Sequence, residues 1–143
     1  MSAEKPRVLI VEARFYDDIA DHLVSGAEEA LDAAHVPYDR IAVPGALEIP
    51  AAIKFSSSKY DAFVALGCVI RGETSHYDIV AGDSARAIMD MTVQDGLCIG
   101  NGILTTENRE QAIVRADPAQ KNKGADAAHA ALALYDLKKK MGA

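Results

Sequence analysis

The sequence has few cysteines and no long hydrophobic run. Its 143 residues include two cysteines, Cys68 and Cys98, which are too few for a disulfide framework and lack a partner at the spacing of a metal site. No stretch reaches the roughly 20 apolar residues that a membrane helix needs. Residues 1–7 are polar and lack the apolar core of a signal peptide. These absences predict a cytoplasmic protein with reduced thiols, no metal centre and no membrane contact.

Positive charge is also scarce. Fifteen lysines and arginines face 21 acidic residues, which gives a formal net charge of −6. A nucleic-acid surface needs a clustered excess of basic residues to neutralise phosphates, so we predict no nucleic-acid partner. The one basic run, residues 138–140, ends the last predicted helix, where it complements the negative end of the helix dipole.

Short apolar runs alternate with segments of helical periodicity. The runs are rich in β-branched residues, as in strands that are covered on both faces, and lie at residues 7–13, 40–43, 62–68 and 97–104. Helical patterns fill the intervening segments, at residues 19–34, 47–56, 75–94, 108–115 and 122–140. This order predicts an α/β fold, a parallel sheet with helices on both faces, formed by one domain over residues 1–143.

The last predicted helix is apolar almost all round, since alanines and leucines dominate residues 127–137. This favours burial against a second subunit. The alternative is a helix of small residues packed tightly on its own sheet.

Ligands of parallel α/β sheets bind beyond the carboxyl ends of the strands. After the first predicted strand, Phe15 either presents its ring to a planar ligand or packs the entry to the following helix. After the second, Gly45 and Ala46 permit a close approach of backbone to a ligand. Glu48 follows in the first helical turn, where it either complements the helix dipole or accepts hydrogen bonds from ligand hydroxyls.

The third strand end carries the richest chemistry. In residues 69–76, Gly72 permits a tight turn, and Thr74 or Ser75 is a candidate cap for the next helix. The free N–H groups at such a helix start form an anion seat. His76 beside this seat is a candidate acid–base group.

The fourth strand end differs. Gly100 and Gly102 lie inside the strand and lack the third glycine of a dinucleotide fingerprint. Farther along, Arg115 and Lys123 flank a short break and either supply positive charge to a ligand or are solvated at the surface.

Taken in order, these segments resemble the 6,7-dimethyl-8-ribityllumazine synthase family. The match is carried by PGALEIP at residues 44–50, VIRGETSH at 69–76, GILTTEN at 102–108 and NKG at 122–124, and it runs from about residue 7 to the last helix. The resemblance implies a flavodoxin-like, three-layer α/β/α sandwich around a four-stranded parallel sheet. It also implies a homopentamer with sites between neighbouring subunits.

The resemblance further implies the penultimate step of riboflavin biosynthesis, without a metal or organic cofactor. The family condenses 5-amino-6-(ribitylamino)pyrimidine-2,4-dione with 3,4-dihydroxy-2-butanone 4-phosphate. The residues that hold the pyrimidine and its ribityl chain would be Phe15, Ala46, Leu47, Glu48, Cys68, Val69, Ile70, Asn101 and Lys123. Among them, Phe15 would stack on the ring and Glu48 would accept hydrogen bonds from ribityl hydroxyls.

The remaining roles concern the second substrate. The resemblance implies that Glu73, Thr74 and Arg115 seat its phosphate. His76 would move protons during imine formation and phosphate elimination. No covalent nucleophile is needed, because the first substrate supplies its own amine.

The sequence departs from the family pattern in two places. Asn101 stands where many members have a phenylalanine that reaches the site of the neighbouring subunit. At this position, hydrogen bonding to the pyrimidine ring of the substrate would replace stacking on it. Residues 117–121 replace the glycine-bearing link that accompanies sixty-subunit capsids. This favours a free pentamer.

Two other functions fit part of this pattern. A flavodoxin-like module that binds flavin without catalysis would share the fold and the anion seat. A phosphosugar isomerase would use His76 and Glu48 as acid and base. Neither explains an aromatic residue, a hydroxyl-reading glutamate and a phosphate seat at successive strand ends as economically as the lumazine synthase function does.

Overall fold

One parallel sheet forms the centre of the protein. In a computed structural model that describes residues 5–143, its strands are β1 (Val8–Ala13), β2 (Tyr38–Val43), β3 (Ala62–Ile70) and β4 (Ile99–Thr106). They lie in the order β2-β1-β3-β4, and each neighbouring pair is parallel. Residues 1–4, where the polar N-terminal segment begins, lie outside the described residues.

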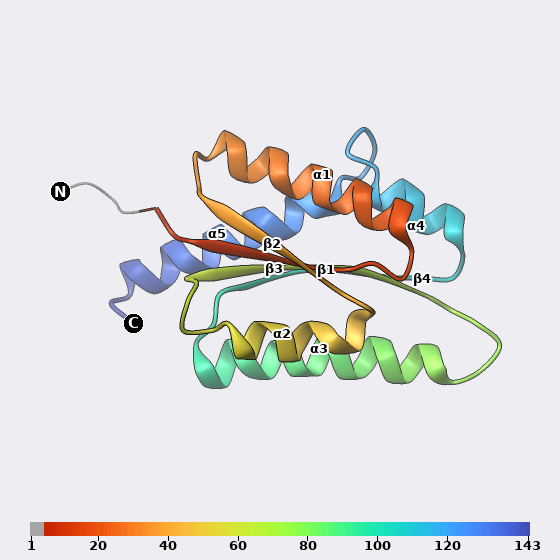
Figure 1. Cartoon of the computed structure of the whole chain (residues 1–143). Helices are drawn as coiled ribbons and strands as arrows, with labels where there is room; N and C mark the ends of the chain where they lie inside the picture. The colour runs from red at the N-terminus through yellow and green to blue at the C-terminus, as the bar shows by residue number, and fades with distance from the viewer. Residues whose placement is uncertain (1–4) are drawn as a thin grey trace.

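Helices cover both faces of the sheet (Figure 1). One face carries α1 (Asp17–Ala33), α4 (Arg109–Ala116) and α5 (Lys123–Lys140). The other carries α2 (Ile49–Phe55), which follows a 3₁₀ turn (Ala46–Glu48), and α3 (His76–Asp95). The predicted three-layer α/β/α sandwich with a four-stranded parallel sheet is therefore confirmed. Within residues 5–143, no helix combines the length and the apolarity needed to cross a membrane.

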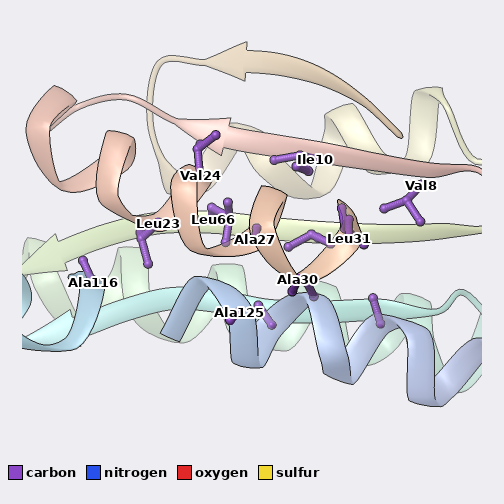
Figure 2. Packing of buried hydrophobic residues seen from close by; sticks show 14 of the residues in the cluster. Val8, Ile10, Leu23, Val24, Ala27, Ala30, Leu31, Leu66, Ala116 and Ala125 are labelled. Carbon is purple, nitrogen blue, oxygen red and sulfur yellow. The ribbon is translucent and has the colours of Figure 1, made fainter. Parts of the chain in front are cut away.

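Small residues bring α5 unusually close to the sheet. A Cβ atom built on Gly100 would lie 1.8 Å from the Ala127 carbonyl oxygen, so only glycine fits at this position of β4. Figure 2 shows Ala125 of α5 beside Ala27 and Ala30 of α1 in the same apolar layer. The apolar character of α5 is thus explained in part by packing on its own sheet. Three of its apolar side chains remain exposed: Ala130, Ala133 and Leu137.

The prediction that all four strands are covered on both faces is wrong for β2, and in part for β4, the other edge strand, where Asn101 and Thr105 are exposed. Four of the six residues of β2 are exposed, Ile41 among them. The reason is lateral position: β2 pairs only with β1 and lies at one edge of the sheet, past the cover that α1 and α2 provide.

The carboxyl ends of β3 and β4 extend past the predicted ends at residues 68 and 104. Parallel pairing continues through Val69 with Thr105 and Ile70 with Thr106. The added residues carry the backbone to the edge of the sheet where the ligand was predicted. The helix after β2 also begins differently from the prediction, because its first turn is 3₁₀ and starts at Ala46.

Candidate active site

A cleft of about 400 Å³ opens at the carboxyl ends of β1, β2 and β3. Because the strands are parallel, segments far apart in the sequence meet at this edge. Its lining comes from Phe15 and Tyr16 after β1, residues 45–48 after β2, residues 68–70 at the end of β3, and Gly72, Thr74, His76, Tyr77 and Val80 before and within α3. We call it the first cleft.

Phe15 is an exposed aromatic platform in this cleft. Its side chain is 74% accessible, although a phenylalanine of a folded core is usually buried. The ring meets Tyr16 edge to face, with centroids 4.9 Å apart, and Tyr16 packs against the apolar layer beneath α1. Tyr16 thus supports the Phe15 ring, while most of the Phe15 side chain stays accessible to a planar ligand.

Buried charge fixes the segment that carries Phe15. The Glu12 side chain at the end of β1 is 3% exposed and accepts hydrogen bonds from Arg14 Nη1 at 2.6 Å and Arg40 Nε at 2.8 Å. Burial on its own would raise the pKa of the Glu12 carboxyl, but hydrogen bonds from Arg40 and Arg14 outweigh it and hold the pKa below its ordinary value. Arg14 also pairs with Asp17 and Asp21 of α1. The strand end and the helix start are thus tied together on both sides of Phe15.

The turn after β2 places Glu48 at the rim of the cleft. Its Oε1 accepts a hydrogen bond from the Gly45 backbone N–H at 2.9 Å, in a capping box that closes the 3₁₀ turn. The structural role that the sequence suggests for Glu48 is therefore present. The same carboxylate lines the cleft beside the exposed side chain of Leu47, where ligand hydroxyls can reach it.

Cys68 contributes surface and not a nucleophile. Burial raises the pKa of its thiol to about 11, so the group stays protonated at neutral pH. Its neighbour Val69 is buried, and both residues line the cleft.

The loop between β3 and α3 supplies the predicted proton-transfer group. His76 is the first residue of α3, is exposed and lines the cleft. The Thr74 hydroxyl accepts a hydrogen bond from the His76 backbone N–H at 3.3 Å, whereas Ser75 at the N-cap position makes no capping bond through its side chain. Of the two predicted caps, Thr74 therefore makes the contact. Glu73 lies between lining residues but does not line the cleft itself.

A second cleft of about 430 Å³ lies along the outer edge of β4, against α4 and α5. It contains Asn101, Arg115 and Lys123. The Asn101 Oδ1 accepts a hydrogen bond from the Ile103 N–H at 2.9 Å, and Arg115 Nη1 donates to the Gln111 carbonyl oxygen at 3.0 Å. Lys123 pairs with Asp126 at 3.5 Å. We call this the second cleft.

The structure therefore separates the predicted site residues into two groups. Those that line the first cleft are Phe15, Ala46, Leu47, Glu48, Cys68, Val69, Ile70, Thr74 and His76. The predicted grouping of Arg115 with Glu73 and Thr74 is not found within one chain, because Arg115 lines the second cleft. Among its described lining residues the first cleft has no lysine or arginine, whereas the second has both.

Three lining residues of the first cleft were not predicted: Tyr16, Tyr77 and Val80. Each tyrosine directly follows a predicted site residue, Phe15 or His76, and this adjacency was the available signal. Val80 follows one helical turn after His76, so it faces the same side of α3. Among residues 5–143, no group of three or more His, Cys, Asp or Glu side chains is arranged to hold a metal ion.

Comparisons with known proteins show which sequences this chain resembles. A family model described as 6,7-dimethyl-8-ribityllumazine synthase matches residues 5–139. The protein of that name from Bartonella tribocorum is 61% identical over 142 residues, which span 97% of this chain and 94% of the relative. The one from Zymomonas mobilis is 61% identical over 137 residues, 94% of this chain and 98% of the relative. A relative from Rhizobium meliloti, 6,7-dimethyl-8-ribityllumazine synthase 1, is 56% identical over 151 residues, 100% of this chain and 99% of the relative.

Proposed function

We propose roles for the site residues of this chain, which belongs to the 6,7-dimethyl-8-ribityllumazine synthase family. It is a transferase of riboflavin biosynthesis that condenses 5-amino-6-(ribitylamino)pyrimidine-2,4-dione with 3,4-dihydroxy-2-butanone 4-phosphate. The products are 6,7-dimethyl-8-ribityllumazine, phosphate and water. The observation that carries the assignment of the site is the convergence of Phe15, Glu48 and His76 at one cleft.

The first cleft binds the pyrimidine substrate. Its ring stacks on Phe15, and the backbone of residues 68–70 contacts the polar edge of the ring. The ribityl chain runs along the 3₁₀ turn, where Leu47 packs against its carbons and Glu48 accepts hydrogen bonds from its hydroxyls. These groups lie on different elements, so the fold holds the substrate amine in one orientation. Such orientation is a large share of catalysis in a reaction without a covalent enzyme intermediate.

His76 serves as the proton-transfer group. When the substrate amine attacks the ketone, the amine loses protons and the carbonyl oxygen leaves as water. Elimination of phosphate then removes a proton from carbon as the C–O bond to phosphate breaks. An exposed imidazole at the rim of the cleft can accept and return these protons in turn. The protonated thiol of Cys68 takes no part in them.

The phosphate group requires positive charge that the first cleft does not supply. The backbone N–H groups at the start of α3, with Glu73 and Thr74, form one side of the seat. Arg115 forms the other side, from the second cleft of a neighbouring subunit, because the two clefts of one chain are separate. A guanidinium can bind phosphate through two parallel hydrogen bonds. Asn101 and Lys123 reach the pyrimidine from the same second cleft.

The function is tested by incubating the purified protein with both substrates while lumazine fluorescence and released phosphate are followed. We expect both signals to rise together, well above the uncatalysed background. A flavin-binding module without catalysis would give neither signal, and a phosphosugar isomerase would act on the phosphate substrate without the pyrimidine. Either result would reject the assignment.

The Arg115→Ala variant tests the phosphate seat. We expect its KM for the butanone phosphate to rise about tenfold or more, because a charge-assisted contact to phosphate is lost. Its KM for the pyrimidine should change little. Lys121→Ala removes an exposed cation from the same region and is the matched control. An unchanged KM for the butanone phosphate in Arg115→Ala would remove this residue from the seat.

The assembly follows from the same argument. Each site needs the first cleft of one chain and the second cleft of another, and a head-to-tail ring of subunits satisfies this for every chain. We propose a homopentamer, and the link at residues 117–121 favours it over a sixty-subunit capsid. Sedimentation velocity should give a single species of five chains. A capsid-sized particle would contradict the inference from the link, and a monomer that retains full activity would contradict the shared site.

A further inference from the structure

The loop that joins β3 to α3, residues 71–75, has few anchors of its own. All five residues are exposed, yet the loop carries Thr74 and leads directly into His76. A Cβ atom built on Gly72 would meet nothing within 4 Å, so this residue gains no support from packing. The backbone is held at its first residue, where the Arg71 N–H donates to the Thr106 carbonyl oxygen at 2.9 Å. The position of the loop therefore depends strongly on Arg71.

The Arg71 side chain makes three further contacts. Its Nε lies 3.0 Å from a Glu107 carboxylate oxygen, and its Nη1 lies 3.5 Å from Asp78 in the first turn of α3. The guanidinium also covers the ring of Tyr77, 4.2 Å from the centroid. Tyr77 lines the first cleft beside His76. One arginine thus connects the start of α3 to the turn that follows β4.

Glu107 continues this connection into α4. Its backbone N–H donates to Gln111 Oε1 at 2.8 Å, and the Gln111 N–H in turn donates to Asn108 at the N-cap. The Gln111 carbonyl oxygen accepts a hydrogen bond from Arg115 at 3.0 Å. A continuous chain of contacts therefore leads from Arg71 through Glu107 and Gln111 to the arginine of the second cleft.

We propose that the ion pair of Arg71 and Glu107 positions two elements relative to each other: the start of α3 at the first cleft and α4 at the second cleft. Each subunit of the ring would then present both of its halves of the phosphate seats in the correct alignment to its two neighbours. Arg71 and Glu107 are both positioning residues, and neither lines the first cleft. This inference rests on the proposed function for its effect on catalysis. The chain of contacts between the loop and α4 does not depend on the proposed function.

The pair is suited to positioning more than to stability. Both side chains are about half exposed, and an exposed ion pair adds little to the stability of the fold. Small displacements of groups that hold a substrate, however, reduce rates strongly. We therefore expect its loss to alter the phosphate site while the melting temperature changes little.

The test compares Arg71→Met, Glu107→Gln and the double variant with Arg7→Met. Arg7 is a matched control, since it also pairs with a carboxylate, Asp39, and covers a tyrosine ring, Tyr60, but at the opposite end of the sheet. We expect each single variant to lose about tenfold in kcat/KM for the butanone phosphate. The KM for the pyrimidine should stay within about twofold, because Phe15 and Glu48 lie on other elements. The double variant should lose no more than Arg71→Met alone, because the contact to Glu107 is already absent in that variant.

Hydrogen exchange provides a readout that does not need turnover. The amides of Asp78 and Ile79 donate to the Ser75 carbonyl oxygen in the first turn of α3. We expect these amides to exchange about tenfold faster in Arg71→Met and Glu107→Gln, and at the native rate in Arg7→Met. Native exchange rates in all variants, losses that add in the double variant, or equal effects on both substrates would overturn the proposal. An inactive parent protein with faster exchange in the variants would reject the proposed function and leave this link supported.

Discussion

Replacing Glu12 by glutamine is expected to lower the free energy of unfolding by about 3 kcal/mol, at the lower end of the range for breaking a buried ion pair. The carboxylate is 3% exposed and is shared by Arg14 and Arg40. Glutamine keeps one acceptor oxygen but removes the charge that both guanidiniums face. The loss stays at the lower end because both arginine side chains retain contact with solvent.

Urea unfolding of the two proteins measures this difference. Lys54→Met is the control, because Lys54 and Asp95 form an ion pair whose side chains are both well exposed. Its loss should cost less than about 1 kcal/mol. If Glu12→Gln and Lys54→Met had equal effects, the buried network would not stabilise the end of β1.

The stability contributed by Glu12 also depends on pH, with a sign fixed by its lowered pKa. The unfolded chain has the ordinary value of 4.5, and the folded state has a lower one. The contribution is therefore fully present above pH 4.5 and is lost as the pH falls through the folded-state pKa. The difference between the parent and Glu12→Gln should be constant near neutral pH and should shrink below pH 4.5.

Replacing His76 by alanine is expected to slow turnover by about 10- to 1,000-fold, within the usual effect of a general acid–base group. The imidazole lines the first cleft at the start of α3. The other titratable side chains that line this cleft are Glu48, Cys68 and two tyrosines. Turnover should not be abolished, because the groups that orient the pyrimidine lie on other elements. Both KM values should change less than kcat.

Steady-state kinetics with added imidazole separates proton transfer from a structural effect. Free imidazole should restore part of the activity of His76→Ala and leave the parent unchanged. His22→Gln on α1, away from both clefts, is the matched control and should keep full activity. A His76→Ala variant with the activity of the parent would exclude the residue from catalysis.

The layers of the fold were predictable because periodicity reports local burial. Continuous apolar runs predicted β1 and β3, which are buried on both faces, and helical spacing predicted the five helices. Periodicity does not report which strand lies at an edge. Ile41 and Val43 resemble core residues in the sequence, and the exposure of β2 emerged only from the strand order.

The first cleft was predictable to a large extent because parallel strands end at one edge of the sheet. Phe15, Glu48 and His76 follow three different strands, and the structure brings them to one cleft. The separation of Arg115 was not predictable in the same way, because it depends on where α4 lies relative to β4. Glu12 also escaped notice: its charge is part of an apolar run, and its partner Arg40 comes from the neighbouring strand.

The close seating of α5 on the sheet has a consequence for synthesis on the ribosome. Strand β1 finds its neighbours β2 and β3 by residue 70, so most of the sheet can pair early. The apolar layer under α1 remains open to solvent until α5 has emerged, since Ala125, Ala128 and Ala131 complete it. Between the pairing of β3 and the arrival of α5, the nascent chain therefore carries an exposed apolar surface, and this is the interval in which chaperone binding would matter most.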